Sequence, residues 1–303
     1  MRAGDAEGET YIAMAKTPPS STSYLLIILA LALALAASAV AAGSGNGSCI
    51  LAERAALLAF KAAITSDPAN LLGSWHGHDC CQWGGVRCHS RTGHVVKLDL
   101  HNEFIEQDYG SFWFPVIVDS DWEPPFNLEL ARFASCHLGP QFPKWLRSQK
   151  GTVVLDISNA GVIDRIPYWF WTTFSDAQFL KVSFNQISGE LPPNLDFMSM
   201  EILFLQSNHL TGLVPQLPRT IVFFDISRNC LSGFVPSNSQ APSLGTVVLF
   251  SNCITGAIPR SFCQWSNLRL LDLSNNQLVG QLPDCGRKEP RRWHNTSNNT
   301  SRL

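Results

Sequence analysis

One pattern of apolar and polar positions repeats along more than half of the chain. Segments of the form LxLxxNxLxGxIP recur, with prolines at positions 143, 167, 192, 215, 236, 259 and 283, which are 21 to 25 residues apart. The LxL alternation predicts a short strand whose leucines point inward while the intervening residues face solvent. A single coil of this kind cannot enclose a core, so the seven registered copies predict a solenoid of stacked coils.

Asparagine follows the strand in five coils, at Asn185, Asn208, Asn229, Asn252 and Asn276. An amide side chain can both donate and accept, so it can satisfy backbone groups that a buried turn would leave unpaired. The stacked copies therefore predict a ladder of asparagines. Two coils depart from the pattern, with Cys136 and Ala160 at this position, and Ala160 is expected to break one rung.

Upstream of the repeats, the pattern changes to a helical one. Residues 53–64 (ERAALLAFKAAI) predict an amphipathic helix with Leu57, Leu58, Phe60 and Ile64 on its buried side. Two tryptophans and a cysteine-rich segment follow this helix. Because an open solenoid end exposes its core, we expect Trp75 and Trp83 to cover it.

The segments ERAALLAFK, LLGSW and DCCQWGGVRC, together with the GxIP coils, resemble the plant extracellular leucine-rich-repeat receptor-like proteins. The resemblance implies an α/β repeat: a leucine-rich-repeat solenoid with short parallel strands on a concave face and a helical, disulfide-bonded N-terminal cap. It also implies bonds from Cys49 to Cys80 and from Cys81 to Cys88. A zinc site built from Cys80, Cys81, Cys88 and His89 is the rival interpretation, but CxxC spacing is missing and the compartment is expected to be oxidising. No metal is expected.

The repeats hold further cysteines. Cys263 and Cys285 are 22 residues apart, close to one coil, and match FCQ and LPDC segments common in the family, so a bridge between neighbouring coils competes with two free thiols. Cys230 and Cys253 share the position after the ladder asparagine in consecutive coils and could form a second bridge.

The N-terminus contains an uncharged apolar run at residues 24–42. It is just long enough to span a membrane, but its basic flank and its A-x-A-like sites favour a signal peptide that is cut near residues 41–43. We therefore expect entry into the secretory pathway and an extracellular or apoplastic location. Glycosylation sequons begin at Asn46, Asn295, Asn298 and Asn299. Family members are usually anchored at the plasma membrane by a C-terminal helix, and this sequence shows no such segment.

These patterns divide the chain into a leader (1–42), the cap (43–97), an incomplete repeat and irregular join (98–129), about seven repeats (130–285) and a polar, disordered tail (286–303). The join resembles an interior stretch of the family that follows the cap too early, so we expect poor packing at residues 103–125. We also expect a truncated receptor with an uncapped last coil. Its exposed side would consist of Leu271, Leu273, Leu278 and Leu282.

Composition and motif content argue against two classes of function. Lys and Arg number 22 against 24 Asp and Glu, a net charge of −2, which argues against nucleic-acid binding. The sequence lacks GxSxG, HExxH, GxxxxGK[ST] and kinase-type motifs, so we expect a protein that is not an enzyme and needs no cofactor.

A curved sheet of this kind offers its solvent-facing strand positions as one surface. Aromatic and cationic side chains are enriched at binding hot spots. The candidate ligand-binding residues are therefore Lys181, Phe184, Phe204, Arg228 and Phe250. The resemblance implies recognition of a protein, peptide or glycan in defence or development, with a co-receptor kinase as partner. The alternatives are a soluble inhibitor resembling polygalacturonase-inhibiting proteins and a nonfunctional truncated gene product.

Overall fold

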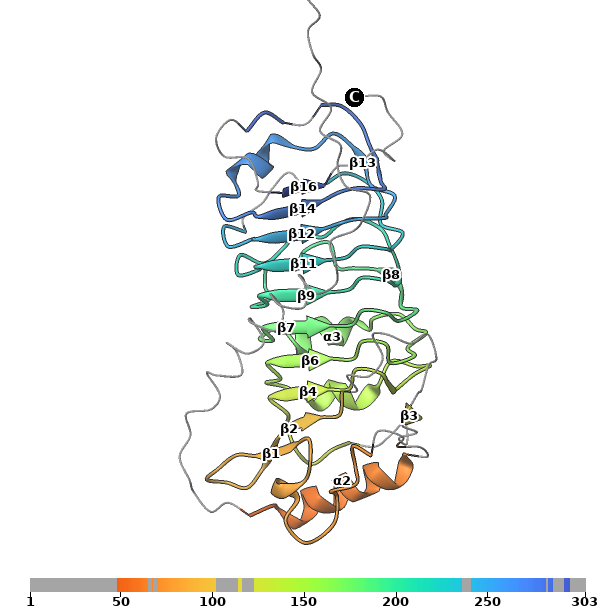
Figure 1. Ribbon diagram of the computed structural model, residues 1–303, viewed down its shortest axis with the longest axis vertical. Helices are drawn as coiled ribbons and strands as arrows, with labels where there is room; N and C mark the ends of the chain where they lie inside the picture. The colour runs from red at the N-terminus through yellow and green to blue at the C-terminus, as the bar shows by residue number, and fades with distance from the viewer. Residues whose placement is uncertain are drawn as a thin grey trace, which may run out of the picture. The chain divides into compact units, whose positions relative to one another are not determined.

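The computed structural model describes residues 48–64, 67, 70–101, 114–115, 123–235, 241–281, 283–285 and 292–294, all within one compact unit that spans residues 46–303. Its main feature is a ten-stranded sheet in the order β1-β2-β4-β6-β7-β9-β11-β12-β14-β16 (Figure 1). Every pair in this sheet is parallel except β1 with β2. The predicted repeat solenoid is confirmed.

The elements are short. The sheet strands are β1 (Val86–Cys88), β2 (Val95–Asp99), β4 (Leu130–Arg132), β6 (Val154–Asp156), β7 (Phe179–Lys181), β9 (Ile202–Phe204), β11 (Phe223–Asp225), β12 (Thr246–Val248), β14 (Leu270–Asp272) and β16 (Arg292–His294). Two-stranded sheets pair β8 (Ser188–Glu190) with β10 (His209–Thr211), β13 (Thr255–Gly256) with β15 (Gln277–Leu278), and β3 (Phe114–Pro115) with β5 (Cys136–His137). The helices are α2 (Leu51–Ala63) and α3 (Tyr168–Thr173), with 3-10 turns η1 (Cys80–Gln82), η3 (Lys144–Ser148) and η4 (Arg260–Gln264).

The middle residue of each repeat strand points into the core. These residues align in register across the sheet and are at most 2% exposed: Ala131, Leu155, Leu180, Leu203, Phe224, Val247 and Leu271. The short helices contribute the other side of the core, where Leu146 of η3, Phe170 of α3 and Phe262 of η4 are buried. The alternation in the sequence therefore sets which face of each strand is buried.

The predicted asparagine ladder is present, and each rung connects a coil to the coil before it. The Oδ1 atoms of Asn208, Asn229 and Asn252 accept from the backbone N–H groups of Ile187, Leu210 and Leu231, at 3.0 to 3.1 Å. Their Nδ2 atoms donate to backbone carbonyls of the preceding coil and of their own. Asn185 and Asn276 make the same contacts, so polar groups inside the turns are paired.

The two departures from the ladder behave differently. At Ala160 the side-chain rung is missing, as expected, and the backbone carbonyl of Ala160 accepts from the N–H groups of Leu138 and Gly139 instead. At Cys136 the buried thiol donates to the carbonyl of Leu100 at 3.4 Å, which reproduces the donor half of a rung. Burial, with a smaller contribution from Asp156, raises the pKa of Cys136 to about 12, so the thiol keeps the proton that it donates.

The residue before each ladder position has left-handed backbone dihedrals. Its φ lies between 50° and 62° at Ser135, Asn159, Phe184, Ser207, Arg228, Ser251 and Asn275. The prediction that Phe184 and Arg228 lie in strands is wrong, because each strand ends three residues earlier. The glycines of GxIP also have positive φ, so a larger residue at Gly233, for example, would strain the backbone and displace the exposed Leu213 side chain, which lies 2.3 Å from an added Cβ.

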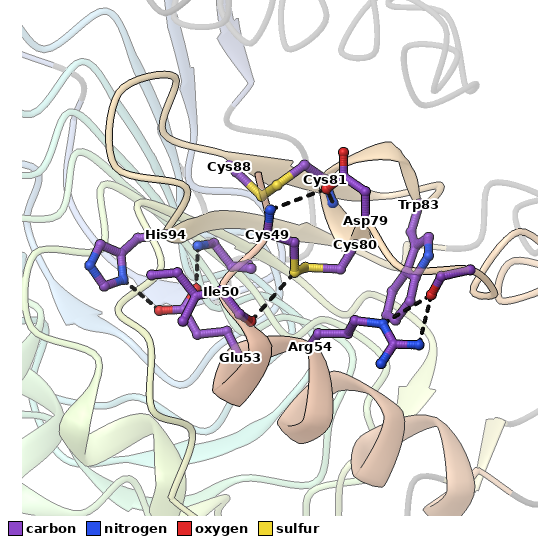
Figure 2. Close-up of a disulfide and its surroundings, with 12 residues drawn as sticks. Cys49, Ile50, Glu53, Arg54, Asp79, Cys80, Cys81, Trp83, Cys88 and His94 are labelled. Carbon is purple, nitrogen blue, oxygen red and sulfur yellow. Dashed lines mark hydrogen bonds and ion pairs between the residues drawn. A yellow bond between two sulfur atoms is a disulfide. The ribbon is translucent and has the colours of Figure 1, made fainter. Parts of the chain in front are cut away.

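The N-terminal cap is built on helix α2, which begins two residues earlier than expected. Leu57 and Phe60 are buried as predicted, whereas Leu58 and Ile64 are only partly buried. Glu53 is buried as well, which the sequence analysis missed. Its carboxylate accepts from the backbone N–H of Val95 at 2.7 Å and lies 2.6 Å from His94 Nδ1 (Figure 2).

Trp75 and Trp83 are buried and stack with their ring centroids 5.4 Å apart, which fits their expected place in the cap. Each indole N–H has a backbone partner: Trp75 donates to Gly84 and Trp83 donates to His76. Arg54 lies over the Trp83 ring at 5.8 Å (Figure 2). The aromatic pair is therefore held by hydrogen bonds as well as by packing.

Three disulfides join the expected partners: Cys49 with Cys80, Cys81 with Cys88, and Cys263 with Cys285 (the first two in Figure 2). The cysteines of the rival zinc site are thus oxidised and offer no thiolate. The bridge that the spacing allowed between Cys230 and Cys253 does not form, because both thiols are free and exposed. Equivalent positions in parallel coils project in the same direction, whereas a disulfide needs side chains that point toward each other.

The last coil differs from the expectation. Leu271, Leu273 and Leu278 are 1 to 4% exposed, so they do not face water. Strand β16, which falls in the segment expected to be disordered, pairs with β14. The expected boundary at residues 97 and 98 also falls inside β2. Leu282, residues 1–42, the four sequons and most of the predicted irregular join lie outside the described residues.

Candidate functional site

The candidate site is the face of the main sheet that points away from the core, which we call the outward face. Its best-defined feature is the row formed by the last residue of each repeat strand, placed side by side by the strand register. From β2 to β14 this terminal row reads Asp99, Arg132, Asp156, Lys181, Phe204, Asp225, Val248 and Asp272. The charged and apolar members of the row are not mixed evenly.

Opposite charges alternate and pair in the N-terminal half of the terminal row. Asp99 Oδ2 lies 3.0 Å from Lys97 Nζ and 3.7 Å from Arg132, and its Oδ1 bonds to His101. Asp156 Oδ2 lies 3.6 Å from Lys181 Nζ. Burial opposes ionisation of Asp99, but the hydrogen bond and charge of His101, followed by those of Lys97, outweigh it and lower the pKa of Asp99 to about 2.

Apolar side chains occupy the centre of the outward face. Phe204 lies between Phe179 and Phe223, with ring centroids 5.9 and 4.8 Å away. The prediction that Phe204 is exposed is wrong: it is 3% exposed, because aromatic residues in both neighbouring strands pack against it. Ile202 belongs to the same patch and is also 3% exposed. None of the four residues belongs to the core cluster on the other side of the sheet.

Aspartates return in the C-terminal half of the terminal row. Asp225 Oδ1 accepts from the backbone N–H and the hydroxyl of Ser227, at 2.9 and 2.7 Å, and Asp272 is held by Ser274 in the same way. Within the described residues, neither carboxylate forms an ion pair with a Lys, Arg or His side chain. Burial raises the pKa of Asp225 to about 6, against the opposing effect of the Ser227 hydrogen bonds; the nearby Asp272 adds to the rise and the charge of Arg228 reduces it.

Four of the five sequence-predicted ligand residues are accessible. Phe184 is 50% exposed and Arg228 is exposed, but both lie in the left-handed turn beside the strands. The guanidinium of Arg228 lies 5.8 Å from the ring centroid of the partly exposed Phe250. Lys181 is partly exposed and joins the paired charges instead of this aromatic group. The five predicted residues therefore do not form one group: Lys181 belongs to the paired charges, and Arg228 lies with Phe250 in another part of the face.

Sequence reasoning missed the carboxylates Asp225 and Asp272 and the aromatic partners Phe179 and Phe223. A signal was available, since the motif Asp-x-Ser recurs in three coils at the same place relative to the ladder position. Phe179 and Phe223, which occupy the same register position on either side of Ile202, were a second signal. Both become visible when the coils are aligned by column and not followed singly along the chain.

The comparisons with known proteins agree with the architecture. Residues 50–89 match the model of the leucine rich repeat N-terminal domain, and residues 267–288 match the model of the leucine rich repeat. In the described part of the chain, we find no helix with the length and apolar character needed to cross a membrane.

The curated relatives are plant receptor-like proteins. The chain is 35% identical to Receptor-like protein EIX2 of Solanum lycopersicum over 184 residues, which cover 59% of this chain and 15% of the relative. It is 38% identical to Receptor-like protein EIX1 of the same plant over 102 residues, which cover 33% of this chain and 10% of the relative. The chain thus spans a small fraction of the length of these relatives.

Fold, cap and ladder define the class: this is a plant-type leucine-rich-repeat solenoid. Among solved structures, it resembles the ectodomain of the Arabidopsis receptor kinase HAESA in complex with an IDA peptide hormone ligand, with a TM-score of 0.55, 23% identity, and coverage of 77% of this chain and 42% of that one. By the family-model matches and the relatives, the chain is similar to plant leucine-rich-repeat receptor-like proteins.

Proposed function

We propose that this chain is an extracellular ligand-recognition module of a plant receptor-like protein, which binds a protein or peptide on the outward face in defence or developmental perception. The observation that carries the proposal is the uneven terminal row. Charges in its N-terminal half pair with one another, while Asp225, which lies beside Phe204, and Asp272 form no ion pair among the described residues. Such a surface combines apolar contact with charge selectivity, as recognition sites do.

Catalysis is not part of the proposal. The receptor-like relatives belong to a ligand-binding kind of protein, and the outward face supplies neither a paired nucleophile and base nor a set of unoxidised metal ligands within the described residues. A co-receptor kinase as signalling partner follows only from the family resemblance, and we include it in the proposal on that basis. We also propose passage through the secretory pathway, which N-terminal sequencing of secreted protein tests by locating a cut near residues 41–43.

The test uses substitutions that the repeat itself already contains. Phe184→Asn, Arg228→Ser and Phe250→Ser introduce residues found at the equivalent positions of other coils, namely Asn159, Ser207 and Ser274. These changes remove the accessible aromatic rings and the Arg228 guanidinium without altering the backbone requirement. Phe204 is left intact, since its burial would make its loss a folding defect.

The secreted protein is used as bait in plant extracellular fluid, and captured proteins and peptides are identified by mass spectrometry. We expect the triple variant to lose a specific captured species that both the unmodified protein and a Tyr168→Ala control retain. Tyr168 is 82% exposed and lies on α3, away from the outward face. Circular dichroism checks that all three proteins fold alike. Identical capture by the triple variant would refute binding at this face.

A further inference from the structure

The solenoid has a second exposed surface, along the side where β8 and β13 lie (Figure 1). We call it the side face, and it consists of residues 209–213, 230–234, 253–257 and 277–281, which follow the ladder asparagine in four consecutive coils. The second residue of each segment is buried, whereas the first and the fifth are exposed. None of the four segments contains Asp, Glu, Lys or Arg, although the coil before them carries Glu190 at the fifth position. The side face is therefore an uncharged surface.

Two large apolar side chains lie uncovered on the side face. Leu213 is 61% exposed and Phe234 is 73% exposed. Each lies over a glycine of the next coil, because a Cβ added at Gly233 would lie 2.3 Å from Leu213 and one added at Gly256 would lie 2.4 Å from Phe234. Single apolar residues on a surface are ordinary, but here Gly233 joins the two side chains into one apolar strip. Such a strip favours contact with another apolar surface.

The side face also holds the two accessible thiols of the chain. Six of the nine cysteines form disulfides, Cys136 is buried, and Cys230 and Cys253 are free and exposed. A chain with three disulfides is suited to an oxidising environment, in which exposed thiols are oxidised as well. The two thiols therefore need a sulfur partner.

The register of the coils keeps these two thiols from pairing with each other. Phe234 bridges Thr255, so neighbouring coils are offset by two residues on this side. The same offset places Cys253 beside Ser232 and not beside Cys230, and the backbone hydrogen bond that Cys253 donates to the coil before it agrees with this placement. A sulfur partner for either thiol therefore has to come from another molecule.

A second copy of this chain matches the charge and the chemistry of the side face. An uncharged surface can face its own copy without placing like charges opposite each other. In a pair of copies related by a two-fold axis, the same patch is used on both sides, so the thiols of one copy meet the thiols of the other. The apolar strips lie beside these thiols in both copies.

We infer that two copies of this chain associate through the side face, and that Cys230 and Cys253 of one copy form disulfides with the same cysteines of the other. This association is separate from the ligand recognition proposed above. It covers Leu213 and Phe234, which a single copy leaves exposed to water.

The bond between the copies forms by thiol–disulfide exchange with a small disulfide, such as oxidised glutathione. A thiolate of one copy attacks the small disulfide, which gives a mixed disulfide and releases one molecule of reduced glutathione. A thiolate of the second copy then attacks the protein sulfur of the mixed disulfide and releases a second molecule of reduced glutathione. Two protein thiols thus lose two electrons and two protons, which oxidised glutathione takes up.

The test follows cross-linking of the purified full chain in a buffer of oxidised and reduced glutathione. Equal amounts of unlabelled and isotope-labelled protein are mixed, the dimer is measured by light scattering and on a non-reducing gel, and its peptides are identified by mass spectrometry. We expect a dimer whose cross-linked peptides join Cys230 or Cys253 of one isotope form to either cysteine of the other. The variant with both Cys230→Ser and Cys253→Ser should form no covalent dimer.

Phe234→Gln tests the apolar strip, and Phe197→Gln is its matched control. Gln281 occupies the position of Phe234 in the last coil, so the repeat accepts glutamine there. Phe197 is 52% exposed and lies between β8 and β9, outside the side face. We expect Phe234→Gln to slow dimer formation about fivefold or more, and Phe197→Gln to leave the rate unchanged. Thermal midpoints check that all variants fold alike.

Three results would overturn the inference. The first is a monomer that carries glutathione on both cysteines, since the small thiol would then be their final partner. The second is a ladder of larger oligomers in which no dimer accumulates, because a two-fold pair closes on itself. The third is an equal rate for the two phenylalanine variants, which would reduce the dimer to chance encounters of exposed thiols. The capture experiment on the outward face is independent of all three.

Discussion

The sharpest stability prediction concerns a single rung of the asparagine ladder. Asn229→Ala removes an acceptor that holds the N–H of Leu210 at 3.0 Å and a donor that lies 3.1 Å from the carbonyls of Leu205 and Ile226. Those carbonyls each keep a second donor, from Asn208 and Asn252 respectively. The main loss is therefore one buried N–H without a partner.

These lost contacts determine how much the free energy of unfolding should fall. An unpaired buried N–H costs about 1 to 3 kcal/mol, and losing the shared donor adds about 1 kcal/mol, so the free energy of unfolding should fall by about 2 to 4 kcal/mol. The matched control is Asn267→Ala, which deletes the same atoms but only one exposed hydrogen bond, to Pro242. It should cost less than about 1 kcal/mol. Ser227→Ala is unsuitable as a surface control because Ser227 is 6% exposed and bonded to Asp225.

Urea unfolding, followed by circular dichroism, supplies the measurement, and double variants test the mechanism. Asn229 and Asn252 share the carbonyl of Ile226, so losing both should cost about 1 kcal/mol or more beyond the sum of the single losses. Asn185 and Asn252 share no partner, and that pair should be additive within about 0.5 kcal/mol. Equal midpoints for Asn229→Ala and Asn267→Ala, or additivity of neighbouring rungs, would refute the reasoning.

Two further predictions concern the cap and the charges beside it. The pKa of Asp99 is lowered to about 2 in the folded protein, from about 3.9 in an unfolded chain, so its contribution to stability is present above about pH 4 and is lost as the pH falls toward 2. Asp99→Asn should therefore make the melting temperature depend less on pH between pH 5 and 2. An unchanged pH dependence in this range would contradict the prediction. Replacing Cys49 and Cys80 by alanine opens a loop with a sequence separation of 31 and should lower the free energy of unfolding by about 4 kcal/mol. Replacing Cys81 and Cys88, with a separation of 7, should lower it by about 2 kcal/mol. Chemical denaturation measures both losses, and the reverse order would show that loop entropy does not dominate.

The sequence predicted the coils and the ladder because each depends on a residue type that recurs at a fixed spacing. The two cap disulfides followed from the family resemblance, and the bond between Cys263 and Cys285 was left open against two free thiols. The sequence did not predict the burial of Phe204, since alternation reveals which face a side chain occupies but not what its neighbours in other strands cover. It also failed to place Phe184 and Arg228 in a left-handed turn, because neither residue type signals that conformation. Equal spacing likewise suggested a bond between Cys230 and Cys253 without revealing the direction of their side chains.

The ladder has a direction, and this matters while the protein is being made. Each asparagine satisfies an N–H of the coil before it: Asn208 serves Ile187, and Asn229 serves Leu210. A ribosome releases the chain N-terminus first, so a newly emerged coil keeps an unpaired amide until the following coil has also emerged. Folding during synthesis should therefore advance one coil behind the growing chain, and a pause in translation would leave only the most recent coil incomplete.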